Sequence, residues 1–471
     1  MSDRGGTVTG GDGRTGQAIA LYHQLLESDP GLAAASWRAL DEGMRAEGLF
    51  FGDRPLCSVL RPHMITVGQY ERVREACRLV IGATKKLGAR MLEDERLIEP
   101  LRLSAREREL VRVDPGYDAV SAISRLDAFL TGDGGEGLHF IEYNAETPAG
   151  GAYTDALTAL FLRLPVVRRF LDEGGYSLQT FDTRGALTEL LLRCYRSWGG
   201  PARAGAGQAP SLAIVDWEGV PTSYEFELCR RYFAERGLPC IVVDPRALEY
   251  TGGALRHGDS RIDLVYKRVL VHELLAREDE APALLRAYAD GAVCMVNSPR
   301  DKLFHKKAIF ALLTDEEYQG GFTAQERAAV ARHVPWTRRV AEGHTTFHGE
   351  RVDLLELLAV ERERFVLKPN DDYGGKGVRV GWEGSAGDWE AALDEALAGD
   401  YIAQERVSVA RGAFPDMAGG ALDFRELSID MDPYIIDGEA DGFLTRVAGT
   451  TLLNVTAGGG STVPTFVLHD Q

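Results

Sequence analysis

The chain has 471 residues, of which 45% are hydrophobic and 26% are charged, and this composition is typical of a soluble globular protein with several domains. Its formal net charge is −18 and no segment concentrates lysine and arginine, which argues against binding to nucleic acids or to anionic membranes. No stretch approaches the length of an apolar membrane-spanning helix. The six cysteines are scattered without a C-x-x-C pair, which indicates free thiols in a cytoplasmic protein.

The first half of the chain changes its pattern several times. Residues 1–16 are polar and rich in glycine, and we expect a disordered lead-in and not a signal peptide. From 17 to 115, apolar residues recur at helical spacing, which predicts a helical N-terminal region. Residues 116–200 predict two short strands around a glycine-rich turn, and then helices. After a small-residue linker, residues 211–295 alternate β-branched strands with a helix, which predicts an α/β subdomain with a parallel sheet.

The second half predicts a mixture of helices and strands. "SPRDKLFHKKAIFALL" (298–313) predicts a helix that begins at its Ser-Pro-Arg-Asp sequence. "FVLKP" (365–369) predicts a strand, and further strands are predicted in "YIAQERV", "ELSIDMDPYII" and "GFLTRVAG". No internal repeat is found. The fold class predicted from these elements is α/β or α+β with several lobes.

A glycine loop follows the "FVLKP" strand. The strand carries Lys368, and the loop contains Gly374, Gly375, Lys376 and Gly377. Successive glycine amides can point into one concavity that suits phosphate oxygens, and a lysine adds a positive charge. The loop lacks both the Gly-Lys-Ser/Thr sequence of a Walker A motif and the Rossmann glycine spacing. Taken alone, it fits a β-hairpin with a solvated lysine equally well.

Two short motifs lie on the predicted strands of residues 116–200. The first is Arg125-x-Asp127, and the second, after the glycine-rich turn, is Glu142-x-Asn144. Residues two apart on a strand share a face, so pairing of the strands would bring all four side chains together. Carboxylate and amide oxygens are ligands that Mg²⁺ accepts. The alternatives are an ordinary surface ion pair and a strand edge that leads into a turn.

These motifs together resemble a known superfamily. The strand lysine, the glycine loop and the downstream "YIAQERV" resemble the nucleotide cleft of ATP-grasp enzymes. The Arg-x-Asp and Glu-x-Asn motifs precede the lysine strand, and this order resembles the circularly permuted ATP-grasp family, of which the synthetase domain of glutathionylspermidine synthetase is a characterised example. The resemblance covers residues 120–460. It implies an ATP-grasp core built from residues 116–200 and 401–471, with an ATP-binding lid at 296–400.

The resemblance also implies a role for individual residues. Two Mg²⁺ ions would be held by Asp127, Glu142 and Asn144, and charge on the reacting groups would be neutralised by Arg125 and Arg446. The residues implied in ATP binding are Lys307 (or its neighbour Lys306, which stands where the family keeps asparagine), Lys368, Gly374, Gly375, Lys376, Gly377, Gln404, Glu405 and Val407.

The implied activity is an ATP- and Mg²⁺-dependent carboxylate–amine ligase that forms an amide through an acyl phosphate and releases ADP and phosphate. Its partners would be a small-molecule carboxylate and an amine, such as an amino acid, a peptide or a polyamine. A phosphotransferase and a silent ATP-binding scaffold are the alternatives. The sequence leaves open the oligomeric state and the roles of Glu146, Asn454 and the glycine loop 457–461. Asp430 and Asp432 are not followed by a Glu-x-Asn pair, so we assign the metal to the upstream strands.

Overall fold

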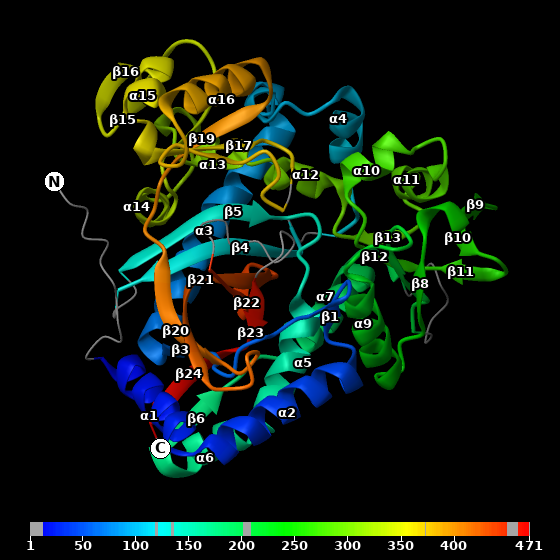
Figure 1. The fold of residues 1–471 in the computed structure, drawn as a ribbon. Coiled ribbons are helices and arrows are strands. Elements are labelled where there is room, and N and C mark those ends of the chain that lie inside the picture. Colours follow the sequence, from blue (N-terminus) through cyan, green and yellow to red (C-terminus); the bar gives the residue numbers. More distant parts are fainter. Residues whose placement is uncertain are drawn as a thin grey trace.

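A computed structural model of the chain describes residues 13–117, 121–132, 136–200, 209–372, 374–449 and 460–470. Within these ranges no helix combines the length and the apolar character that are needed to span a bilayer. All six cysteines are free. The fold is mixed α/β, as the sequence predicted, and its parts are arranged around one central sheet (Figure 1).

The central sheet is antiparallel and has the strand order β23-β22-β21-β4-β5, with β20 paired to β21. Its strands are β4 (Ile123–Thr131), β5 (Gly137–Asn144), β20 (Ala410–Asp416), β21 (Asp423–Ile436), β22 (Glu439–Ala448) and β23 (Ser461–Val463). Leu126, Ala128 and Met431 pack against the long helix α3 (Val67–Glu93) in one core cluster. Because side chains alternate along a strand, Arg125 and Asp127 point to the opposite face. We call this the cleft face.

A second, smaller antiparallel sheet has the order β14-β19-β17-β18, and we call the unit around it the lid. Its elements are β14 (Thr337–Arg339), β17 (Phe365–Pro369), β18 (Arg379–Val380) and β19 (Tyr401–Glu405), with the hairpin β15 (His344–Phe347) and β16 (Glu350–Asp353) and the helices α15 (Leu354–Val360) and α16 (Ala386–Ala398). Phe365, Leu367 and Trp389 contribute to its own hydrophobic core. In Figure 1 the lid, drawn in yellow and orange, lies above β4 and β5.

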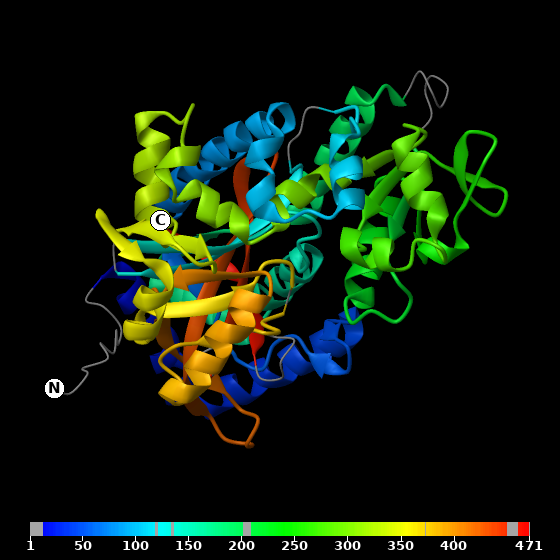
Figure 2. The same cartoon turned by 90° about the horizontal axis from the view of Figure 1, so that it is seen from above.

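The predicted parallel sheet is confirmed, with the order β13-β12-β7-β8 and parallel pairing throughout. Its strands are β7 (Leu212–Val215), β8 (Cys240–Val243), β12 (Leu264–Lys267) and β13 (Cys294–Val296). The same unit contains the helices α9 (Ser223–Glu235), α10 (Val271–Ala276) and α11 (Pro282–Ala289). It also contains a small antiparallel sheet of β9 (Glu249–Thr251), β10 (Ala254–His257) and β11 (Ser260–Ile262). This green unit lies to one side of the central sheet in both Figure 1 and Figure 2.

The N-terminal region is mostly helical, but one of its strands joins the far end of the chain. Its helices are α1 (Arg14–Ser28), α2 (Pro30–Glu47), α3 and α4 (Ala105–Arg112), and its short strands are β1 (Phe50–Phe51), β2 (Arg54–Pro55) and β3 (His63–Thr66). Strand β3 pairs in parallel with β24 (Thr465–Asp470), which also pairs with β6 (Tyr176–Gln179). The helices α1 and α2 pack with α5 (Gly151–Phe161), α6 (Pro165–Gly174) and α7 (Thr183–Ser197).

The prediction of one continuous helix over residues 298–313 is wrong. The chain forms a 3₁₀ turn at Pro299–Asp301, then α12 (Lys302–His305) and α13 (Ala308–Leu313), and Lys306 between the two helices is extended. The cause is a contact from the lid, because the side-chain oxygen of Asn370 accepts from the Ala308 amide and its carbonyl accepts from the Lys307 amide. The next helix is α14 (Ala324–His333), and further 3₁₀ turns lie at Glu95–Leu97, Glu99–Leu101, Pro245–Ala247, Glu316–Tyr318 and Arg362–Arg364.

Candidate functional site

The two predicted motifs meet on the cleft face. Strands β4 and β5 pair so that Arg125 is opposite Asn144 and Asp127 is opposite Glu142. The Arg125 guanidinium donates to both Asp127 oxygens, at 2.7 and 3.1 Å. The Asn144 amide donates to Asp127 Oδ1 at 2.9 Å. The strand pairing expected from the sequence is therefore present, and it gathers two carboxylates and one amide within one hairpin.

Strands β21 and β22 add three more charged side chains to this group. Arg446 Nη2 lies 2.9 Å from Asp127, 2.7 Å from Asp430 and 2.9 Å from Asp432. Asp432 also accepts from the amide of Ala128 on β4, at 2.9 Å. The sequence interpretation set Asp430 and Asp432 aside, although their spacing of two on a strand already placed them on one face. The structure brings them beside the predicted Arg446 and Asp127.

The charges in this group shift the pKa values of the three aspartates in different directions. Burial alone would raise the pKa of Asp127, but the guanidiniums of Arg125 and Arg446 outweigh it and hold the pKa at about 2. Burial raises the pKa of Asp430 to about 6. Burial, and then the charges of Asp127 and Asp430, raise the pKa of Asp432 well above its ordinary value. Three carboxylates thus share two guanidiniums, and Asp127 is the one whose pKa the guanidiniums hold below its ordinary value.

The raised pKa of Asp430 predicts a pH dependence of stability. The native state binds this proton more tightly than the unfolded chain does, so the contribution of Asp430 to stability falls as the pH rises from about 4 to 6. In Asp430→Asn this loss is absent, and we expect its Tm, measured with EDTA and without nucleotide, to decline less than that of the wild type over this interval. The exposed Asp423→Asn on the same strand is the control, and equal slopes for Asp430→Asn and the wild type would contradict the assignment.

Two lysines from the lid side reach the same strand. Lys307 Nζ lies 3.1 Å from Glu142 Oε1 and donates to the carbonyl of Asp372. Lys368 Nζ donates to the carbonyl of Ile141 on β5 at 3.0 Å, across 227 residues of chain, and to Gln404 Oε1 at 2.7 Å. Burial lowers the pKa of Lys368 to about 8. For Glu142 burial is the largest influence and favours a higher pKa, but the charges of Lys307 and Lys368 together outweigh it and lower the pKa.

Because the chain breaks between α12 and α13, the side chains of Lys306 and Lys307 point in different directions. Lys307 caps α13 and points to Glu142, whereas Lys306 Nζ lies 2.5 Å from Asp371 on the lid loop. Both residues are buried, and neither lies on the solvated helix face that was the alternative interpretation. The structure therefore places Lys307, and not Lys306, beside Glu142 on β5.

The predicted adenine hinge lies at the end of β19. Gln404 is buried and bridges Lys368 and the hydroxyl of Thr337, which is 3.2 Å from its Nε2. The Glu405 carboxylate accepts from Arg364 at 2.8 Å and lies away from the aspartates, and Val407 follows the strand and is half-buried. Of the three, only the Gln404 side chain contacts the lysines of the site.

The glycine loop extends from the lid into solvent. Gly374, Gly375 and Gly377 have φ angles of +70°, +72° and +71°, and residues other than glycine rarely adopt this backbone conformation. A Cβ at Gly377 would lie 2.7 Å from the Pro369 ring. The Lys376 side chain is 82% exposed, so it is not gathered with Lys307 and Lys368. The C-terminal prediction for Asn454 and for residues 457–459 lies outside the described residues.

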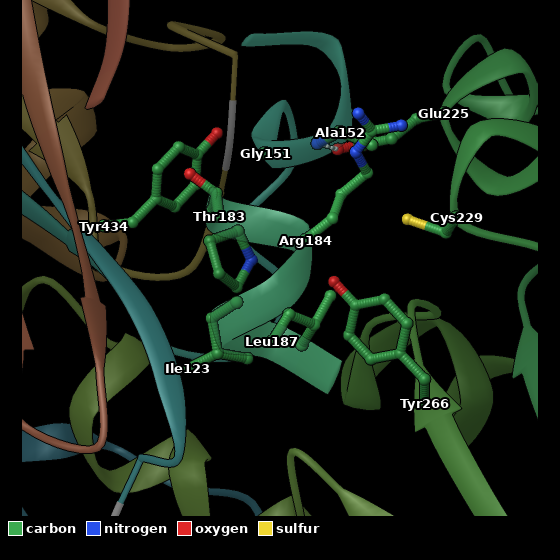
Figure 3. Close-up of a pocket in the computed structure, with 11 residues that line it drawn as sticks. Ile123, Gly151, Ala152, Thr183, Arg184, Leu187, Glu225, Cys229, Tyr266 and Tyr434 are labelled. Atoms are coloured by element: carbon green, nitrogen blue, oxygen red, sulfur yellow. Dashed lines mark hydrogen bonds between the residues drawn. The ribbon is translucent and has the colours of Figure 1, made fainter. Parts of the chain in front are cut away.

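A pocket continues the cleft face towards the parallel-sheet unit (Figure 3). It is lined by Ile123, Pro148, Gly151, Ala152, Thr183, Arg184, Leu187, Glu225, Cys229, Tyr266 and Tyr434. Figure 3 shows Tyr434 on one side and Cys229 and Tyr266 on the other, with α7 between them. The pocket adjoins Arg125, because Arg125 Nη1 and the Tyr434 hydroxyl both donate to the carbonyl of Ala149, at 2.9 and 2.7 Å.

Comparison with solved structures defines the class of fold. The chain shares its mixed α/β fold with a glutathione synthetase-like effector of Globodera pallida, solved in its apo form, at a TM-score of 0.58 and 14% identity; the match covers 93% of this chain and 98% of that chain. A candidate γ-glutamylcysteine synthetase of Methylobacillus flagellatus gives a TM-score of 0.38 at 13% identity, over 86% of this chain and 89% of that one. This second likeness is too weak to support an argument.

Among curated proteins, the chain is similar to a candidate glutamate–cysteine ligase, named glutamate–cysteine ligase 2-3, of Frankia alni. The two are 25% identical over 365 residues, which cover 74% of this chain. The match spans only 39% of the relative's length. No family model matches the chain.

Proposed function

We propose that the protein is an ATP- and Mg²⁺-dependent carboxylate–amine ligase with a circularly permuted ATP-grasp fold. The observation that supports this most directly is the meeting of Lys307 and Lys368, from the lid side, with the Glu142 strand of the central sheet. The two lysines and the oxygen-bearing strand are far apart in the chain, and the fold brings them into contact. The fold shared with a glutathione synthetase-like protein agrees with the proposal.

The side chains present suit the ligands that the proposal requires. Mg²⁺ takes hard oxygen ligands and keeps several waters, so Asp127, Glu142 and Asn144 would hold it with few protein atoms. Within the described residues, no three or more histidine, cysteine, aspartate and glutamate side chains are grouped so that they could hold a metal ion. The proposed ligand set is of a different kind, because it combines two carboxylates with one amide. Bound Mg²⁺ would neutralise charge on the β- and γ-phosphates.

The chain itself supplies positioning and charge. Lys307 and Lys368 would orient the phosphates, and Arg125 and Arg446 would neutralise negative charge on the transferred phosphoryl group and on the tetrahedral intermediate of amide formation. The substrate carboxylate attacks the γ-phosphate to give an acyl phosphate, and the amine then displaces phosphate. No side-chain nucleophile is required, and the pocket beside Arg125 is our candidate position for the substrates.

The relative's name describes the ligation of glutamate to cysteine, so amino acids are the first substrates that we propose. The test is ADP release with glutamate and cysteine, then with pooled amino acids, short peptides and polyamines, while mass spectrometry reads the adduct. We expect ADP, phosphate and a product that equals the two substrates minus one water. ADP formation with a single acceptor and no amide would establish a phosphotransferase instead, and nucleotide binding without turnover would establish a scaffold.

A further inference from the structure

A buried cluster of charged side chains lies behind the nucleotide cleft and takes no part in the proposed chemistry. It consists of Glu107, Glu146, Lys302, Lys306 and Asp371, and we call it the anchor cluster. Lys302 is at its centre and its side chain has no exposed surface; its Nζ lies 2.6 Å from Asp371, 3.0 Å from Glu146 and 3.7 Å from Glu107. Lys306 Nζ lies 2.5 Å from Asp371 and 3.5 Å from Glu107.

The members of the anchor cluster come from parts of the fold that the proposed reaction must hold together. Glu146 lies two residues after Asn144, at the end of the metal-ligand strand, and Asp371 lies three residues after Lys368, where the glycine loop begins. Lys302 contacts both carboxylates at once. The cluster therefore joins the ligand strand of the central sheet to the base of the loop in the lid.

The sequence left the role of Glu146 open, and the orientation of its side chain indicates that role. Its side chain is buried, and it accepts from the amide of Val271 at 2.8 Å and lies 3.7 Å from Lys267, in addition to its contact with Lys302. These three partners hold it away from the cleft face, where Glu142 and Asn144 lie. The charges of Lys302, then His305 and Lys267, outweigh burial and hold the pKa of Glu146 well below its ordinary value.

Buried charges hold their partners tightly, because a carboxylate that loses its ammonium in a low-dielectric environment pays the full desolvation cost. Asp371 has two ammonium partners, Lys302 and Lys306, and Lys302 cannot follow it outward without leaving Glu146. The loop is thus fixed at Asp371.

We propose that the Lys302–Asp371 pair is an anchor that fixes the base of the glycine loop to the metal-ligand strand and thereby positions the loop for the nucleotide. Lys302 and Asp371 are positioning residues, since they act through the loop and touch no reacting atom. This inference rests on the proposed function for its nucleotide, but the anchor itself is a property of the ligand-free chain.

The test is Asp371→Asn, which removes one charge and keeps the shape of the side chain. We expect deuterium exchange in the peptide that spans residues 369–378 to become at least fivefold faster, with exchange in β5 unchanged. We expect the KM for ATP to rise about tenfold while kcat stays within twofold, because a loop that is less preorganised weakens binding more than it alters the closed complex. Asp371→Glu should restore part of both effects. The matched control is Asp394→Asn, an exposed residue on α16.

A second variant guards against simple unfolding. Asp371→Asn combined with Lys306→Met removes one anion and one cation, so the remaining cluster keeps its balance of charge. Faster loop exchange with a Tm close to the wild-type value would support the anchor. Loop exchange equal to that of the wild type in both variants, with or without a change in Tm, would overturn it. The exchange measurement needs no turnover, so a wild-type protein that neither binds nor hydrolyses ATP would overturn the proposed function and still leave the anchor to be decided.

Discussion

Lys368→Met should lower kcat/KM for ATP by about a hundredfold to a thousandfold, the range found when one preorganised donor to a developing charge is removed. The Lys368 ammonium donates to two neutral oxygens, the carbonyl of Ile141 and the side-chain oxygen of Gln404. Burial has lowered its pKa to about 8, so it is mostly protonated at pH 7 and its charge is poorly compensated. A phosphate that replaces these oxygens would gain a strong charge-assisted contact.

The loss should be specific to nucleotide handling. Methionine keeps most of the apolar stem of lysine, so the lid core around Phe365 and Leu367 should be preserved and the Tm should change little. The matched control is Lys86→Met, because Lys86 is an exposed lysine whose partner, Glu326, lies outside the cleft. Steady-state kinetics and direct binding of an ATP analogue measure the effect. Wild-type turnover by Lys368→Met would remove Lys368 from the site.

The part of the site that the sequence predicted is the part set by local rules. A spacing of two residues fixes which side chains share a strand face, and a glycine-rich turn joins two strands into a hairpin. Those two rules were enough to bring Arg125 and Asp127 opposite Asn144 and Glu142. The parallel sheet was likewise predictable, because strand–helix–strand units favour it. In each case the pattern and the structure it determines lie in one short segment.

The parts that could not be predicted depend on contacts between distant segments. Asp432 joins the site because β21 pairs with β4, and 304 residues separate it from the Ala128 amide that it binds. No local pattern encodes that pairing. The helix predicted over residues 298–313 has good local propensity, and it is broken by Asn370 from the lid. Tertiary contacts overrode propensity there, and the break determines that Lys307 faces Glu142.

Glu142→Gln should lower turnover by at least about a hundredfold and raise the Mg²⁺ concentration needed for half-maximal activity by at least about tenfold. The change is nearly isosteric, but it removes one of the two carboxylates in the proposed ligand set. It also removes the negative partner of Lys307, which lies 3.1 Å from Glu142 Oε1. A Mg²⁺ titration of ATP turnover measures both quantities, and excess Mg²⁺ should restore part of the activity.

The partial rescue by Mg²⁺ separates a metal ligand from a residue that only positions Lys307. If Glu142 served only to hold the lysine, Lys307→Met would have the same effect as Glu142→Gln and extra Mg²⁺ would restore neither variant. If Glu142 binds the metal, the Mg²⁺ requirement rises in Glu142→Gln and stays near the wild-type value in Lys307→Met, whose defect is in nucleotide binding. The exposed Glu136→Gln, in the turn directly before β5, controls for a change of charge near that strand. An unchanged Mg²⁺ requirement in Glu142→Gln would move the metal away from this strand, with Asp430 and Asp432 as the next carboxylates to test.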